Sequence, residues 1–145
     1  MPIQYVWVCS AVLKAGAKAY TKVPVSCVED PVRGAETAIQ RVYPIMIDTV
    51  VVPSIPSGAP DYIVRVEKEG VDGIIRPLAD SVPASILNKL LSATGKVPDA
   101  FMEYGEPVSI YVAPMEKVYL FVVTLADYTG TTDVTYTFQV VAEKG

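Results

Sequence analysis

Few residues of this sequence could carry out acid–base or metal chemistry. The chain has no histidine, so it lacks the usual general base and the commonest metal ligand. Glu103 and Glu106 are a possible carboxylate pair, but they fall in a predicted connection between a helix and a strand, where such groups are mostly solvated. Asp127 and Asp133 bracket a turn at a spacing that does not match a calcium-binding loop, and we expect them to accept hydrogen bonds from nearby backbone amides.

No sequence motif compensates for the missing histidine. The chain contains no Gly-x-Ser-x-Gly, no Ser-x-x-Lys and no glycine-rich phosphate loop. We therefore predict a protein that is not an enzyme and that has no catalytic residue, no cofactor and no metal.

The two cysteines, Cys9 and Cys27, fall on consecutive predicted strands. A disulfide between them would stabilise the fold by about 3 kcal/mol. We favour free thiols over this disulfide, because a chain made in the cytosol meets reducing conditions and buried cysteines pack as small hydrophobic residues. A zinc site would lack ligands, since two cysteines without histidine make only half of a tetrahedral set.

Two aromatic residues share one face of the first predicted strand. Tyr5 and Trp7 are separated by one residue, so their side chains point the same way along an extended backbone. Aromatic rings on an exposed face could stack on a sugar, whereas under a neighbouring subunit they would form part of the contact. Inward-facing core positions explain other tyrosines, such as Tyr62 and Tyr136, at least as well.

The strongest strand pattern lies near the C-terminus. Residues 117–125 are apolar on both alternating faces, which is typical of a central strand covered on both sides. Residues 134–140 alternate apolar with polar side chains, as a strand with one wet face does. The turn-forming residues 127–133 are too few for a crossover helix, so we predict an antiparallel hairpin.

Further strands precede this pair. The strand predicted over residues 3–13 is apolar on both faces, which indicates burial on both sides or a place under a partner subunit. Other predicted strands and a hairpin cover residues 20–28, 42–52, 61–67 with 74–77, and 107–113.

One helix is predicted near residues 82–94. Ser81 can cap it, Ile86 and Leu90 belong to an apolar stripe at helical spacing, and Gly95 and Pro98 end it. With about eight strands around this short inserted helix, the pattern predicts an all-β fold, an antiparallel two-sheet sandwich. The strand count and the position of the helix favour a jelly roll over an immunoglobulin-like sandwich. Residues 1–145 suit a single domain.

Residues 53–60 form the clearest loop, with three prolines and a glycine. Such a segment is extended and polyproline-like rather than flexible. We expect an exposed loop or arm that contacts neighbouring subunits through Pro53, Ile55, Pro56 and Pro60.

The composition is apolar for a chain of this size. Hydrophobic residues make up 51% and charged residues 19%, against roughly 25% charged in an average protein, which suggests that other subunits cover part of the surface. The net charge of −4 and the scattered lysines and arginines argue against nucleic acid and against an anionic membrane surface. No apolar segment approaches the ~20 residues of a transmembrane helix.

The N-terminus lacks the positively charged segment of a signal peptide, so we expect synthesis in the cytoplasm without one. Twelve prolines and few amide side chains are typical of proteins from thermophiles. The surplus of charged residues that such proteins also show is missing.

Together these features favour a non-enzymatic structural protein. The hypothesis is a homo-oligomer that assembles with itself, and with other coat subunits, as a virion coat or decoration subunit, because compact sandwiches without active sites are often used in this way. Tyr5, Trp7 and the proline-rich arm would make the subunit contacts. The alternative is a β-sandwich module that binds a carbohydrate or another small ligand through Tyr5, Trp7 and loop aromatics.

Overall fold

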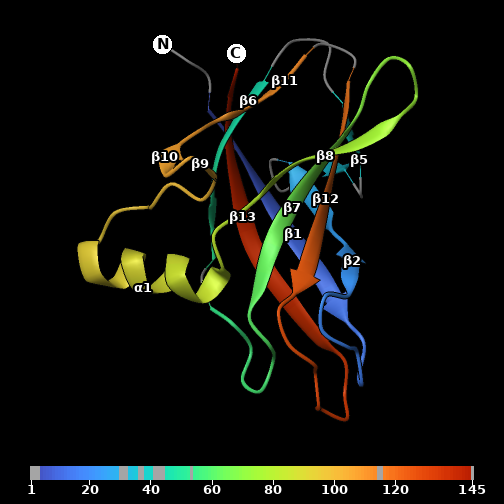
Figure 1. Cartoon of the computed structure of the whole chain (residues 1–145), viewed down its shortest axis with the longest axis vertical. Helices are drawn as coiled ribbons and strands as arrows, with labels where there is room; N and C mark the ends of the chain where they lie inside the picture. The colour runs from blue at the N-terminus through green and yellow to red at the C-terminus, as the bar shows by residue number, and fades with distance from the viewer. Residues whose placement is uncertain are drawn as a thin grey trace.

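The protein is described by a computed structural model that covers residues 4–29, 33–35, 38–40, 45–52, 54–113 and 116–144. Antiparallel strands dominate these residues, and one short helix, α1 (Ala84–Thr94), is inserted among them (Figure 1). The prediction of an all-β chain with one short helix is confirmed.

The larger sheet has six strands. Their order is β11 (Ile110–Val112), β6 (Ile45–Val51), β13 (Val134–Lys144), β1 (Gln4–Leu13), β3 (Ser26–Glu29) and β4 (Arg33–Ala35). β1 and β13 lie near its centre and pair along the whole length of β1.

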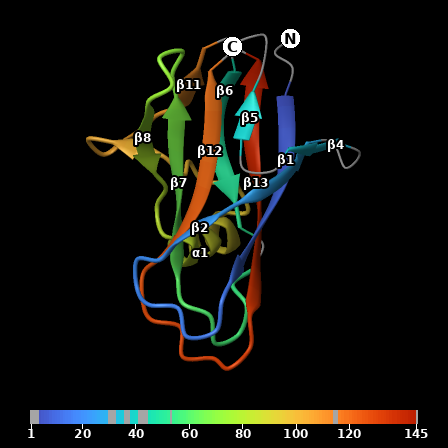
Figure 2. The same cartoon turned by 90° about the vertical axis from the view of Figure 1, so that its right-hand side faces the viewer.

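The second sheet has five strands. Its order is β2 (Lys22–Pro24), β12 (Lys117–Thr124), β7 (Tyr62–Glu69) and β8 (Ile75–Asp80), and β5 (Ala38–Gln40) also pairs with β12. Figure 2 shows β7 and β12 on one side of the molecule and β13 and β1 on the other. A separate small hairpin joins β9 (Met102–Glu103) to β10 (Glu106–Pro107).

The two halves of the chain pair with each other from the ends inward. β1 pairs with β13, β2 with β12 and β6 with β11, and β7 pairs with β8 where the chain turns back. The predicted hairpin over residues 61–67 and 74–77 corresponds to β7 and β8 and is confirmed.

The predicted hairpin between residues 117–125 and 134–140 is wrong. The structure places these strands in different sheets, where β12 pairs with β7, and β13 pairs with β1 and β6. The connection between them is bound to the β1–β2 connection, because Asp133 accepts a hydrogen bond from the Ala15 backbone N–H and Asp127 accepts one from Ala19. A turn-rich linker of this length can close a hairpin or cross between sheets, and the local sequence does not distinguish the two.

One hydrophobic cluster joins both larger sheets. β1 contributes Trp7 and Leu13, β13 contributes Tyr136 and Phe138, and β7 contributes Tyr62, all of them buried. The Tyr62 and Tyr136 rings lie 4.4 Å apart between their centroids, so they connect the two sheets directly. A tilted aromatic pair of this kind adds about 1 kcal/mol beyond the area that it buries.

Candidate functional site

Trp7 lies in the core and offers no surface to another molecule. Its exposed fraction is 0%, and alternate residues of β1, such as Cys9 and Leu13, point inward with it. The expected role of Trp7 in a subunit contact or a sugar platform is therefore corrected. The side chain of Tyr5 lies outside the described residues.

The outward face of β1 is carried by the residues between these buried ones. Val6, Val8 and Val12 are 41–46% exposed. β13 pairs alongside and places Val141 opposite Val6, and Gln139 opposite Val8. We call this surface the β1–β13 face; it consists of Val6, Val8, Ser10, Val12, Thr135, Thr137, Gln139 and Val141. These eight residues carry no charge, and Glu143, which lies opposite Gln4 beside Asp48, borders the face at one end.

A simple signal could have identified these valines in the sequence. Alternation along the strand places Trp7, Cys9, Ala11 and Leu13 on one face. A lone tryptophan in a strand that alternates small and large apolar residues fills a core more often than it is exposed. The face opposite Trp7 is then the free one, and it carries Val6, Val8 and Val12.

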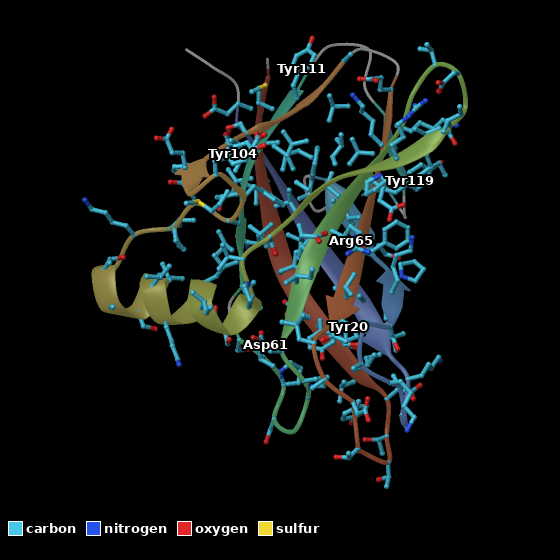
Figure 3. All side chains as sticks on the ribbon, in the orientation of Figure 1. Tyr20, Asp61, Arg65, Tyr104, Tyr111 and Tyr119 are labelled. Carbon is cyan, nitrogen blue, oxygen red and sulfur yellow. A yellow bond between two sulfur atoms is a disulfide. The ribbon has the colours of Figure 1, made fainter. Side chains whose placement is uncertain are left out.

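The outward side of the second sheet has a different character. Lys22 forms an ion pair with Glu67 at 3.0 Å and lies 4.3 Å from the centroid of the Phe121 ring. Arg65, labelled in Figure 3, donates two hydrogen bonds to Asp80, at 2.8 and 3.2 Å, and this contact raises the pKa of the guanidinium. Paired charges therefore keep this sheet compatible with water, in contrast to the β1–β13 face.

A hollow of about 520 Å³ lies beside these pairs. Its lining comes from the ion-paired Arg65, Glu67 and Asp80 and from the apolar run Pro77, Leu78 and Ala79. The charges that line it already have partners, so it presents donors and acceptors without a free charge.

The proline-rich loop is attached to the molecule rather than extended as an arm. Ile55 is half-buried and packs against the core cluster, and Pro56 is also half-buried. A turn is closed by a 3.0 Å hydrogen bond from the Ala59 N–H to the Pro56 carbonyl. Pro60 is buried, and its carbonyl accepts a 2.7 Å hydrogen bond from the Tyr136 hydroxyl. Ser54 and the tip of the loop at Ser57 and Gly58 are exposed, while Pro53 lies outside the described residues.

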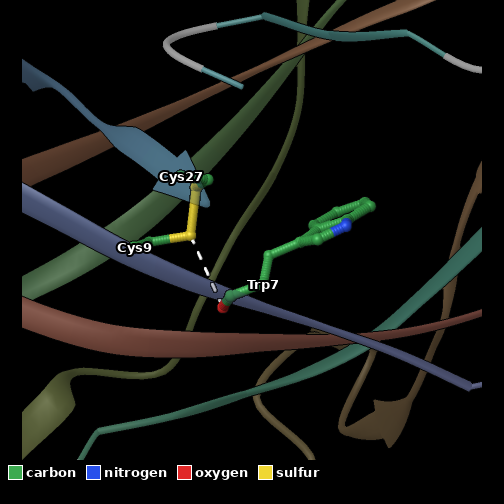
Figure 4. Close-up of a disulfide and its surroundings, with 3 residues drawn as sticks. All are labelled: Trp7, Cys9 and Cys27. Atoms are coloured by element: carbon green, nitrogen blue, oxygen red, sulfur yellow. Dashed lines mark hydrogen bonds between the residues drawn. A yellow bond between two sulfur atoms is a disulfide. The ribbon is translucent and has the colours of Figure 1, made fainter. Parts of the chain in front are cut away.

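Cys9 and Cys27 are joined in a disulfide, where the sequence favoured free thiols (Figure 4). The antiparallel register of β1 and β3 places them directly opposite each other, with their Cα atoms 4.0 Å apart. Both are buried, at 1% and 2% exposure. The Cys9 sulfur also lies 3.7 Å from the Trp7 carbonyl oxygen, but as a disulfide sulfur it has no proton to donate.

The four candidate carboxylates are exposed and lie in or beside turns. Glu103 and Glu106 face each other across the exposed β9–β10 hairpin, and Asp127 and Asp133 accept hydrogen bonds from backbone amides. Within the described residues, no group of three or more histidine, cysteine, aspartate or glutamate side chains could hold a metal ion. The helix in that part of the chain is too short to cross a membrane.

Comparison with known proteins adds no family. No protein-family model matches the chain, and no curated protein matches it. Inference about function therefore depends on the surfaces described above.

Proposed function

We propose that the fold is a jelly roll, a sandwich of two antiparallel sheets. A jelly roll is a long antiparallel hairpin rolled into two sheets, and the nested pairing of β1 with β13, β2 with β12, β6 with β11 and β7 with β8 supports it. In an immunoglobulin-like sandwich the last strand pairs with the strand before it. Here β13 instead pairs with β1 and β6.

We further propose that the protein is a non-enzymatic structural subunit that assembles with itself. The observation that carries this proposal is the β1–β13 face, two strands wide and free of charge, on a chain whose other sheet is covered by ion pairs. A contiguous uncharged surface near the centre of a sheet is typical of a subunit contact. Jelly rolls recur in coat proteins of viruses, so a virion coat or decoration subunit is the role that we propose by analogy of fold.

Assembly through a sheet face is favoured over assembly through an edge. β8 is an edge strand of the second sheet, and Pro77 lies within it opposite Glu67, next to a shift in register. A proline and a bulge interrupt the row of backbone groups that an added strand would need. We therefore assign the contact to side chains of the β1–β13 face.

The test is native mass measured by size-exclusion chromatography with light scattering over a range of concentrations. Val8→Lys places a charge in the middle of the face and should lower the native mass of the assembly, whose subunit mass is 15.6 kDa. Ile75→Lys is the matched control, because Ile75 is exposed to a similar extent, 49% against 45%, on an edge strand of the other sheet. A wild-type protein that is monomeric at every concentration, or a Val8→Lys variant that assembles normally, would contradict the proposal.

A second candidate function is the binding of a carbohydrate or another small ligand. The observation that favours it is the hollow of about 520 Å³ beside Arg65 and Glu67, whose paired charges suit a neutral ligand rich in hydroxyl groups. Trp7 is removed from this hypothesis because it is buried. Calorimetric titration of neutral oligosaccharides, repeated with Arg65→Ala, tests it: binding that this variant abolishes would support a site here.

A further inference from the structure

The β9–β10 hairpin presents one side chain completely to solvent. Tyr104 lies in its turn with 99% exposure, the highest among the exposed large hydrophobic residues described. Figure 3 shows it at the hairpin on the same side of the sheets as α1. A fully exposed aromatic side chain on a protruding turn is suited to act as an anchor that inserts into a partner.

Two local features of the hairpin are unfavourable for folding. Tyr104 has a φ of 51°, in the left-handed region that bulky residues seldom adopt. Glu103 lies directly opposite Glu106 across the two short strands, which places like charges face to face. Local features that work against the fold are frequent where residues serve a contact rather than stability.

An apolar groove lies beside this hairpin. It has a volume of about 340 Å³, and its lining includes Leu90, Val97, Pro98, Met102 and Pro107. Leu90, Val97 and Met102 are 43–51% exposed, so they lack cover in the described part of the chain. α1 contributes to this exposure because, of its residues, only Ala84 and Leu87 are buried. The groove is large enough to receive an aromatic ring.

The hairpin and the groove carry polar groups that can pair with each other. Two glutamates, Glu103 and Glu106, flank Tyr104 in the hairpin. The lining of the groove also includes Lys96 and Asp99, and both are exposed. Lys96 can pair with a glutamate, and the carboxylate of Asp99 can accept a hydrogen bond from a tyrosine hydroxyl. In the described part of the chain none of these four charged side chains takes part in an ion pair.

We propose that two copies of the chain form a dimer in which Tyr104 of each copy fills the apolar groove of the other. We call this contact the hairpin exchange; each β9–β10 hairpin stays intact. The anchor and the groove share one hairpin, since Met102 and Pro107 at its base line the groove while Tyr104 stands in its turn. A two-fold axis beside the hairpin therefore satisfies both contacts at once, as a self-complementary interface requires.

This inference rests on the proposed self-assembly and extends it. A single two-fold contact ends at a dimer, whereas a coat or a decorated shell needs at least two different contacts per subunit. The hairpin exchange and the β1–β13 face use different strands, so together they can continue an assembly.

The experiment is sedimentation velocity over a concentration series. Tyr104→Ser should weaken the hairpin contact at least tenfold, because it removes a buried aromatic anchor. Tyr20→Ser is the matched control, since Tyr20 is also exposed, at 73%, and also has a positive φ of 62°. Val8→Lys disrupts the contact through the β1–β13 face, so this variant should form only the dimer that the hairpins make.

A charge exchange tests the predicted pairing. The hairpin variant Glu103→Lys with Glu106→Lys keeps like charges opposite each other, so it should fold as the wild type does. The Val8→Lys background isolates the hairpin contact. In that background the hairpin variant and the groove variant Lys96→Glu should each associate weakly alone, and an equimolar mixture should associate more tightly than either.

The outcomes separate the two proposals. If Tyr104→Ser assembles like the wild type and Val8→Lys is a monomer, the hairpin exchange is overturned and the β1–β13 face stands. If Tyr104→Ser reduces the assembly and Val8→Lys does not, the hairpin exchange stands and the β1–β13 face is overturned. A monomeric wild type, or an unchanged assembly in both variants, overturns both.

Discussion

The carboxylate of Asp61 accepts two hydrogen bonds from Ser85, one from its backbone N–H at 2.9 Å and one from its hydroxyl at 2.6 Å. Asp61 immediately precedes β7, and Ser85 lies in the first turn of α1. The residue at the N-cap position is Pro83, which makes no capping hydrogen bond through its side chain. Asp61 therefore satisfies a free N–H of the helix from a distant part of the sequence and places a negative charge at its N-terminus.

Asp61→Ala should lower the free energy of unfolding by about 1–2 kcal/mol, the usual cost of losing a helix cap. The loss should be accompanied by faster hydrogen exchange in α1, since few of its side chains are buried. Unfolding in urea and exchange measured by mass spectrometry check the two effects. Asp80→Ala is a useful control because Asp80 makes exposed ion-pair contacts without capping a helix; equal losses in both variants would count against the capping role.

Tyr62 and Tyr136 provide a comparison between two buried hydroxyl groups. The Tyr136 hydroxyl donates a hydrogen bond to the Pro60 carbonyl, whereas the Tyr62 hydroxyl has no partner among the described residues. Tyr136→Phe should therefore lower the free energy of unfolding by about 1–3 kcal/mol, because the Pro60 carbonyl loses its donor. Tyr62→Phe should be neutral or stabilising. Urea unfolding of both variants checks this order, and the reverse order would refute it.

Alkaline pH should destabilise the fold through the same tyrosines. Burial raises the pKa of Tyr136 to about 12, with further contributions from the charges of Asp61 and Tyr128, and burial also raises the pKa of Tyr62. Below the ordinary tyrosine pKa of about 10 both states hold the proton, so the stability is fully present. Above it the unfolded chain ionises first, and stability is lost as the pH rises through the folded pKa. Free energies of unfolding should fall less steeply in Tyr136→Phe than in the wild type between about pH 10 and 12; parallel curves would contradict this assignment.

The sequence predicted where the strands and the helix lie better than it predicted which strands pair. Alternation and turn residues located the β7–β8 hairpin because its two strands are close in sequence. The same signals failed for β12 and β13, because pairing with β7 and β1 depends on contacts across the whole chain. The cap of α1 illustrates the same limit: Ser81 is adjacent to the helix, but its hydroxyl accepts the Val64 N–H, and Asp61 caps the helix instead.

The candidate contact surface was predicted in part. The sequence indicated that the first strand has two apolar faces, and the structure separates them into a buried face with Trp7 and an outward face with Val8. Within the strand, the lone tryptophan is the signal that distinguishes the buried face from the outward one. Similarly, three prolines predicted a stiff loop, but not the hydrogen bond from Tyr136 that holds its end at Pro60.

The disulfide between Cys9 and Cys27 gives the last prediction. It closes a loop with a sequence separation of 18 residues and joins β1 to β3 inside the core. Replacing both cysteines by alanine should lower the free energy of unfolding by about 3 kcal/mol, since the bridge restricts the unfolded chain. The wild type unfolded in the presence of a dithiol reductant should lose a similar amount, while the double alanine variant should not respond to the reductant. An unfolding curve of the wild type that reductant leaves unchanged would show that the thiols are free, and β3 would then be held to β1 by backbone pairing and packing alone.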